Sequence, residues 1–208
     1  MSCQILKADS PGIQKAAQII LQGGLVAFPT ETFYGLAGEA GNEAALEKIF
    51  RVKGREEGKP LLLLVADKSW LQGLVQEVPP LAERLMNGFW PGPLTLVFKA
   101  SPQISPLLTA STGKIGIRVS SHPVAQALVQ AVGRPITGTS ANLSGQRSTS
   151  SAQEVFQSLG ENLDAILDGG RTAGGRGSTV LDISGPSPQI IREGAVTRKE
   201  LAPFFGKV

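Results

Sequence analysis

Short, nearly continuous apolar runs recur along the chain and alternate with longer stretches in which apolar residues return at helical spacing. The runs lie at 25–28, 61–66, 94–98 and 115–119. Apolar runs of this length are too short for helices and are typical of buried strands. Helical stretches lie between several of them, without strict alternation. This order predicts one α/β domain over residues 1–208, with a mixed sheet.

Capping and stop residues indicate where several helices begin and end. Ser10 and Pro11 predict the start of a helix, and Gly23 and Gly24 predict its end. Asn42 is expected to cap a second helix. Further helices are expected at 67–76, 80–88, 123–132, 152–159 and 197–205, and further strands at 135–139, 164–168, 178–183 and 189–192.

The composition excludes several classes of protein. Of 208 residues, 41% are hydrophobic and 18% charged, a balance typical of globular chains and not of disordered ones. The sequence has no apolar run long enough to cross a membrane, and it does not open with a secretory signal. The single cysteine, Cys3, excludes an internal disulfide. We therefore expect a cytoplasmic protein with no membrane partner.

The charges are unevenly distributed along the chain. No acidic residue lies between Glu83 and Glu154. Six basic residues lie in that interval: Arg84, Lys99, Lys114, Arg118, Arg134 and Arg147. A segment without carboxylates suits a site that holds anions, because a carboxylate would repel them. The alternative is an ordinary solvated surface with chance spacing.

Two segments that follow predicted elements carry polar and charged side chains. The segment 29–36 follows a predicted buried strand, where ligands bind in open α/β sheets, and Thr30 and Thr32 offer hydroxyl groups. The alternative is a structural turn whose threonines bond nearby backbone. The segment 53–60 carries three cations in a glycine-containing loop, where lysine and arginine suit phosphate. Its two glutamates offer the alternative of a self-paired, solvated loop.

Three later segments combine glycine with small polar or basic side chains. The segment 138–145 is a cluster of hydroxyl and amide groups that would let backbone amides approach an anion, or is a plain polar loop. The segment 175–180 is a glycine-rich entry into a strand, and 191–194 places a cation at a strand end.

Several known sites are absent from the sequence. It has no Gly-x-x-x-x-Gly-Lys-Ser/Thr phosphate-binding loop. His122 is the only histidine and Cys3 the only thiol, which excludes a His/Cys metal cluster and a Ser-His-Asp triad. We expect His122 to cap or pack at a helix start and no metal to be held by protein ligands alone. A metal ion here would be Mg²⁺ held mainly by substrate phosphates.

Seven segments, in this order, resemble motifs of the YrdC/YciO family of L-threonylcarbamoyladenylate synthases. They are PTETFYGL at 29–36, KGR at 53–55, WPGPLTLV at 90–97, GIRV at 116–119 with HP at 122–123, SANLSG at 140–145, STV at 178–180 and IREG at 191–194. The match spans nearly the whole chain, and seven ordered motifs are far more specific than any one of them.

The resemblance implies a twisted, YrdC-like α/β fold with a deep, positively charged cavity. It implies a nucleotidyltransferase that makes threonylcarbamoyl-AMP and pyrophosphate from ATP, L-threonine and bicarbonate, with Mg²⁺ carried on the ATP phosphates. Threonylcarbamoyl-transferase proteins downstream would use the product to modify an adenosine beside the anticodon of tRNA.

The resemblance also implies roles for particular residues. The implied catalytic residues are Lys53, Arg55, Ser140 and Asn142. The implied ATP-binding residues are Arg55, Lys59, Ser140, Ser148 and Arg192. The implied threonine-binding residues are Thr32, Arg118 and Ser178. Thr30 and Lys114 are expected to lie in the same pocket.

The sequence departs from the family pattern at three places. Glu56 stands where many members have proline, and Leu64 stands where long members often have a histidine that contacts threonine. Ser120 or Ser121 replaces a proline. The length of the chain suggests a short form, which leaves as the alternative a YciO-like protein that binds double-stranded RNA or tRNA with weak or no synthase activity. A carbamoyl-transfer domain of hydrogenase-maturation proteins is a third reading.

Overall fold

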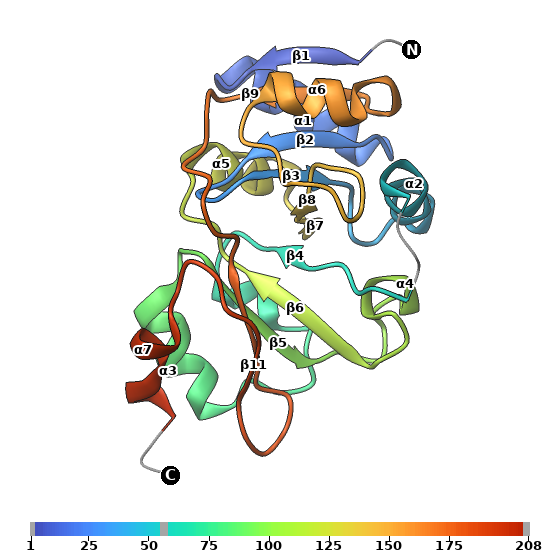
Figure 1. Ribbon diagram of the computed structural model, residues 1–208. Coiled ribbons are helices and arrows are strands. Elements are labelled where there is room, and N and C mark those ends of the chain that lie inside the picture. Colours follow the sequence, from blue (N-terminus) through green and yellow to red (C-terminus); the bar gives the residue numbers. More distant parts are fainter. Residues whose placement is uncertain (1–2, 55–57, 206–208) are drawn as a thin grey trace.

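The strands form two mixed sheets, one above the other in Figure 1, in a computed structural model that describes residues 3–54 and 58–205. The α/β class is thereby confirmed, but two sheets stand where the apolar runs predicted one. The strand order within each sheet follows pairings between distant parts of the chain, which local patterns do not encode.

The first sheet has five strands, drawn in the upper half of Figure 1. The first three strands across the sheet are parallel to one another, and each of the last two is antiparallel to the strand before it. In order across the sheet they are β1 (Gln4–Lys7), β9 (Ala165–Asp168), β2 (Val26–Pro29), β3 (Tyr34–Ala37) and β8 (Thr139–Ser140).

The second sheet has six strands and lies below the first in Figure 1. In order across the sheet they are β11 (Gln189–Arg192), β10 (Thr179–Asp182), β5 (Leu94–Lys99), β6 (Lys114–Arg118), β4 (Leu63–Leu64) and β7 (Ile136–Thr137). Two of its five pairings are parallel and three antiparallel.

Helices cover both faces of the first sheet. Helices α1 (Ser10–Leu21) and α5 (Pro123–Val132) pack together against one face, with Ile20, Phe28 and Leu128 in a common apolar cluster. Helices α2 (Glu43–Lys53) and α6 (Ala152–Leu159) contribute to a larger cluster that continues into the second sheet. Burial of these faces supplies the main driving force for the fold.

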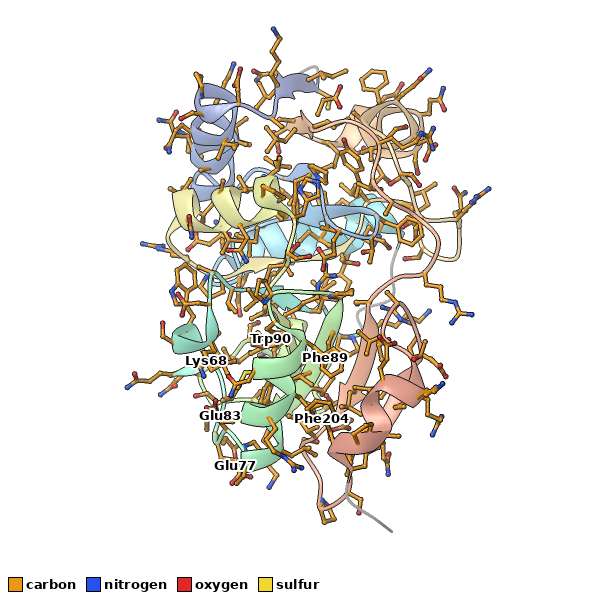
Figure 2. All side chains as sticks on the ribbon, turned by 90° about the vertical axis from the view of Figure 1, so that its left-hand side faces the viewer. Lys68, Glu77, Glu83, Phe89, Trp90 and Phe204 are labelled. Atoms are coloured by element: carbon orange, nitrogen blue, oxygen red, sulfur yellow. The ribbon has the colours of Figure 1, made fainter. Side chains whose placement is uncertain are left out.

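One longer and two short helices pack near the second sheet. They are α3 (Pro80–Phe89), α4 (Pro106–Thr109) and α7 (Arg198–Leu201), with 3₁₀ turns at Lys68–Leu71 and Ala202–Phe204. A third 3₁₀ turn, Gly160–Asn162, follows α6 and leads into β9 of the first sheet. Figure 2 shows Phe89 of α3 beside Phe204 of the last turn, and their ring centroids lie 5.3 Å apart. Among the described helices, none has the length and apolar content that crossing a membrane requires.

Most predicted helices are confirmed. Asn42 accepts a hydrogen bond from the backbone N–H of Ala45 and so caps α2. His122 caps α5, as expected, by accepting at Nδ1 from the N–H of Val124. The cap of α1 is Asp9 and not Ser10.

Two local predictions are wrong, and one strand was not predicted. The expected helix at 67–76 is only the 3₁₀ turn Lys68–Leu71, and Gly73, with a φ of 84°, lies outside the helical region. The apolar run 61–66 is mostly buried but forms a strand only at Leu63–Leu64. The strand that was not predicted is β3.

Gly138 marks the point where the chain passes from the second sheet to the first. It lies between β7 and β8, and its N–H donates to the carbonyl oxygen of Leu62 at 3.0 Å. A Cβ at this position would lie 2.8 Å from side-chain atoms of Leu62 and Leu64, closer than carbon atoms pack. Only glycine allows this approach without a shift of these leucines.

Candidate active site

A cavity of about 670 Å³ is lined by strands of both sheets. Strands β3 and β8 contribute from the first sheet, and β5, β6, β10 and β11 contribute from the second. Nine residues that sequence analysis assigned to a site line it: Thr30, Thr32, Lys59, Lys114, Arg118, Ser140, Ser148, Ser178 and Arg192. Among the described lining residues, four are basic and one, Asp182, is a carboxylate, so the expected basic cavity is present.

Two of the implied residues that the structure describes are placed differently. The side chains of Lys53 and Asn142 lie outside the cavity lining. Arg55 lies outside the described residues. Leu64 also lies away from the cavity, fully buried in the apolar cluster of α1 and α5, so a threonine contact at this position is not supported.

Arg118, at the end of β6, is a nearly buried cation in the cavity wall. Its side chain is 4% exposed, and its Nη1 donates to Oε1 of Glu31 at 3.0 Å. The Oγ of Ser120 donates to the other oxygen, Oε2, of Glu31. Glu31 lies in the turn between β2 and β3, so this ion pair joins the two sheets.

Part of the Arg118 guanidinium has no partner. Its Nε is buried, and no acceptor for it exists among the described residues. Burial lowers the pKa of Arg118, the Glu31 carboxylate opposes that effect, and the positive charge of Arg192 lowers the pKa further. A buried N–H without an acceptor is energetically costly, so the ion pair with Glu31 matters for keeping Arg118 in this place.

Arg192 and Ser178 form another part of the cavity wall. The Nη2 of Arg192 donates to the backbone oxygen of Ser178 at 2.8 Å and to its Oγ at 3.2 Å. The Oγ of Ser178 also lies 3.0 Å from Oγ1 of Thr95 on β5. Gly194 allows this arrangement, because a Cβ there would lie 2.1 Å from the backbone oxygen of Gly177.

Thr30 and Thr32 face each other in the turn before β3. Their hydroxyl oxygens lie 3.1 Å apart, and the Thr30 hydroxyl donates to the backbone oxygen of Phe33 at 2.6 Å. The structural interpretation of this turn is confirmed, since Thr30 bonds backbone. Ligand binding stays a prediction for two threonines that both line the cavity.

Lys114 and Asp182 form an ion pair at another part of the wall, with Nζ 2.8 Å from Oδ2. The Oδ1 of Asp182 accepts from the N–H and the hydroxyl of Ser184. Burial alone would raise the pKa of Asp182, but the hydrogen bonds from Lys114 and Ser184 hold it below its ordinary value. The carboxylate is therefore ionised at neutral pH.

Lys53 and Asn142 organise the loop that follows β8. The Nζ of Lys53, on a side chain that is almost fully buried, donates to the backbone oxygens of Ser140 and Asn142. The Nδ2 of Asn142 donates to the backbone oxygens of Leu143 and Gln146, at 2.8 and 2.9 Å. In this structure both side chains hold the loop that presents Ser140 to the cavity.

The carboxylate-free stretch of sequence is not free of carboxylates in space. Four of its six cations pair with acidic residues from outside the stretch. The pairs are Lys99–Glu77, Lys114–Asp182, Arg118–Glu31 and Arg134–Glu39. Sequence analysis missed Glu31, although it stands between the two threonines it singled out, because carboxylates were expected to be excluded from the site.

The described residues offer no ready-made metal site. Nowhere within residues 3–54 and 58–205 do three His, Cys, Asp or Glu side chains come together. The one described carboxylate of the cavity wall, Asp182, already accepts from Lys114 and Ser184.

A sequence profile of the family named Sua5, YciO and YrdC, described as "Telomere recombination", matches residues 18–194. The chain belongs to this family. A threonylcarbamoyl-AMP synthase of Bacillus subtilis (strain 168) is 40% identical over 204 residues, which cover 98% of this chain and 59% of the relative. The chain thus spans less than two thirds of that relative, and 58% of a synthase of the same name from Pyrococcus abyssi.

Solved structures of the Sua5/YciO/YrdC family have the same fold. A structure of P. abyssi Sua5 complexed with L-threonine superposes with a TM-score of 0.95 at 36% identity, over 100% of this chain and 62% of that chain. A structure of E. coli YciO superposes with a TM-score of 0.86 at 31% identity, over 98% of this chain and 100% of that chain.

Proposed function

We propose that this chain is an L-threonylcarbamoyl-AMP synthase. The observation that carries the proposal is a single basic cavity, lined by nine of the residues that the family resemblance implies. Relatives named for this activity support the proposal and favour it over RNA binding without synthesis. The proposal includes the handover of the product to threonylcarbamoyl-transferase proteins that act on tRNA, in the cytoplasm.

The reaction has two steps. The threonine nitrogen forms a bond to the carbon of bicarbonate, water leaves, and a carbamate results. A carbamate oxygen then attacks the α-phosphorus of ATP, the bond from that phosphorus to the β-bridging oxygen breaks, and pyrophosphate leaves with the oxygen. Mg²⁺ enters as part of the nucleotide substrate, since it is bound mainly by phosphates in such sites.

The cavity residues divide between the two substrates. Arg118 would bind the threonine carboxylate, with Thr32 and Ser178 contacting other polar groups of threonine. The ATP phosphates would be bound by Lys59 and Arg192, and by Ser140, Ser148 and Arg55 on the family resemblance. Fixed cations offset the charge that grows on pyrophosphate as it leaves, which lowers the barrier.

Lys53 and Asn142 would contribute through the loop that they hold. Their bonds to the loop after β8 keep Ser140 and its backbone in the cavity wall. Positioning of this kind accounts for catalysis by residues that form no covalent intermediate.

The test is pyrophosphate release by the purified chain from ATP and Mg²⁺. We expect release only when L-threonine and bicarbonate are both present, and threonylcarbamoyl-AMP in equal amount. Release that is independent of threonine contradicts the proposal. No release under any condition, together with RNA binding that weakens steeply with salt, would support the YciO-like alternative.

A further inference from the structure

The ion pair of Glu31 and Arg118 holds a cation in the cavity wall. Arg118 lines the cavity, whereas Glu31 is not among the lining residues. Glu31 accepts from Nη1 of the guanidinium at 3.0 Å. The side chain of Arg118 is only 4% exposed, so its position and its charge depend on this partner.

Glu31 is itself held in place by a chain of hydrogen bonds that begins at α5. The N–H of His122 donates to the Oγ of Ser120 at 3.2 Å, so that the Ser120 hydroxyl points its hydrogen at Oε2 of Glu31. Ser120 is 2% exposed, and its backbone oxygen accepts from Nε2 of Gln126 at 2.6 Å. The carboxylate therefore has one oxygen for Ser120 and one for Arg118.

We propose that Glu31 is the positioning residue for the substrate carboxylate: it compensates the buried charge of Arg118 and holds the guanidinium in the orientation in which it meets L-threonine. The proposal rests on the proposed function for the identity of the amino acid. Glu31 does not touch the substrate, and it acts only through the orientation and charge of Arg118.

Charge alone suggests a competing role for Glu31, which predicts the opposite change in threonine binding. If Glu31 merely competed with the substrate carboxylate for Arg118, its removal would strengthen threonine binding. Positioning predicts weaker binding, because an uncompensated guanidinium in a buried wall reorients toward other acceptors or toward water. The sign of the change in threonine affinity separates the two.

The experiment compares Glu31→Gln with Glu39→Gln. Glu39 is a matched control: its side chain is 11% exposed against 14% for Glu31, and it accepts from Nη1 of Arg134 at 2.6 Å, outside the cavity lining. The two carboxylates flank the same strand, β3. Both variants lose a charged partner of an arginine, but Arg118 is 4% exposed and Arg134 is 63% exposed. The urea midpoint of each variant therefore separates a loss of folding from a loss of binding.

We expect Glu31→Gln to weaken L-threonine binding by about 10-fold to 100-fold, as the loss of a charge-assisted contact does. The KM for ATP should stay within about twofold of the wild-type value, and Glu39→Gln should change neither constant. Ser120→Ala should weaken threonine binding in the same direction but less, because Arg118 keeps its partner.

The preference for L-threonine over L-threoninamide reports the carboxylate contact directly, because the amide lacks the charge. We expect this preference to shrink at least about 10-fold in Glu31→Gln and to persist in Glu39→Gln. Threonine binding that is unchanged or tighter in Glu31→Gln overturns the proposal.

Calorimetric binding of L-threonine keeps this inference separate from the proposed function. If the wild-type chain binds threonine but releases no pyrophosphate, the proposed synthase activity is contradicted, and the role of Glu31 in threonine binding can still be tested. A wild-type chain that binds no threonine overturns both.

Discussion

Tyr34 is the buried residue that ties the first sheet to the turn after β9. It is fully buried, and its hydroxyl donates to the backbone oxygen of Gly170 at 2.7 Å while accepting from the N–H of Gly169 at 3.3 Å. Burial raises the pKa of Tyr34 to about 12, and the Asp168 carboxylate adds to that effect. The phenol is therefore a fixed hydrogen-bond donor beside the cavity.

The shifted pKa of Tyr34 predicts an alkaline limit to stability. Since the pKa is about 12 in the folded state and near 10 when unfolded, the unfolded chain loses this proton first as pH rises. Stability from this group is complete below pH 10 and is lost as pH rises from about 10 to about 12. Urea midpoints across that range measure the loss, and the chain's single tyrosine makes its ultraviolet titration unambiguous.

Tyr34→Phe is the control for that titration. It leaves the Gly170 oxygen without its donor and should lower the free energy of unfolding at pH 7 by about 1–3 kcal/mol. The variant should also lose part of the alkaline dependence. An unchanged slope of stability between pH 10 and pH 12 would show that other groups set the alkaline limit.

At the scale of elements, local signals predicted the helices and failed for the shortest strands. Asn42 and His122 cap their helices through side chains, a signal written within four residues of sequence. The strand β4 pairs at only two residues of a six-residue apolar run, because its partners β6 and β7 come from distant parts of the chain. The division into two sheets was invisible for the same reason.

The close approach at Gly138, where the chain crosses from the second sheet to the first, predicts that a larger residue there destabilises the fold. In Gly138→Ala the new methyl group would lie 2.8 Å from side-chain atoms of Leu62 and Leu64, so these side chains or the backbone that carries them must shift. We expect the free energy of unfolding to fall by about 1–3 kcal/mol, as in other overpacked sites. Urea denaturation measures the change.

Gly185→Ala is the matched control for that variant. A Cβ at Gly185 meets no atom within 4 Å and needs no left-handed backbone. Its effect should stay within about 0.5 kcal/mol, as for most surface substitutions. Equal effects of the two variants would mean that lost glycine flexibility, and not the close approach at Gly138, sets the cost.

For the whole molecule, the order of motifs predicted which residues meet, but not how their charges are balanced. Residues as distant as Thr32 and Arg192 line one cavity, as the family resemblance implied. Glu31 and Asp182, which pair with cations of the wall, were not assigned to the site. A pattern of like charges along the sequence does not report carboxylates that arrive from other strands.

A cavity built from both sheets predicts that substrates stabilise both together. A ligand that binds only the folded state adds about 2.7 kcal/mol to its stability at 100 times the dissociation constant. We expect Mg–ATP with L-threonine to raise the melting temperature and to slow amide hydrogen exchange in β3 and in β6. Free L-arginine, added in place of L-threonine at the same concentration, serves as the control ligand. Protection confined to one sheet would contradict a site shared by Thr32 of the first sheet and Arg118 of the second.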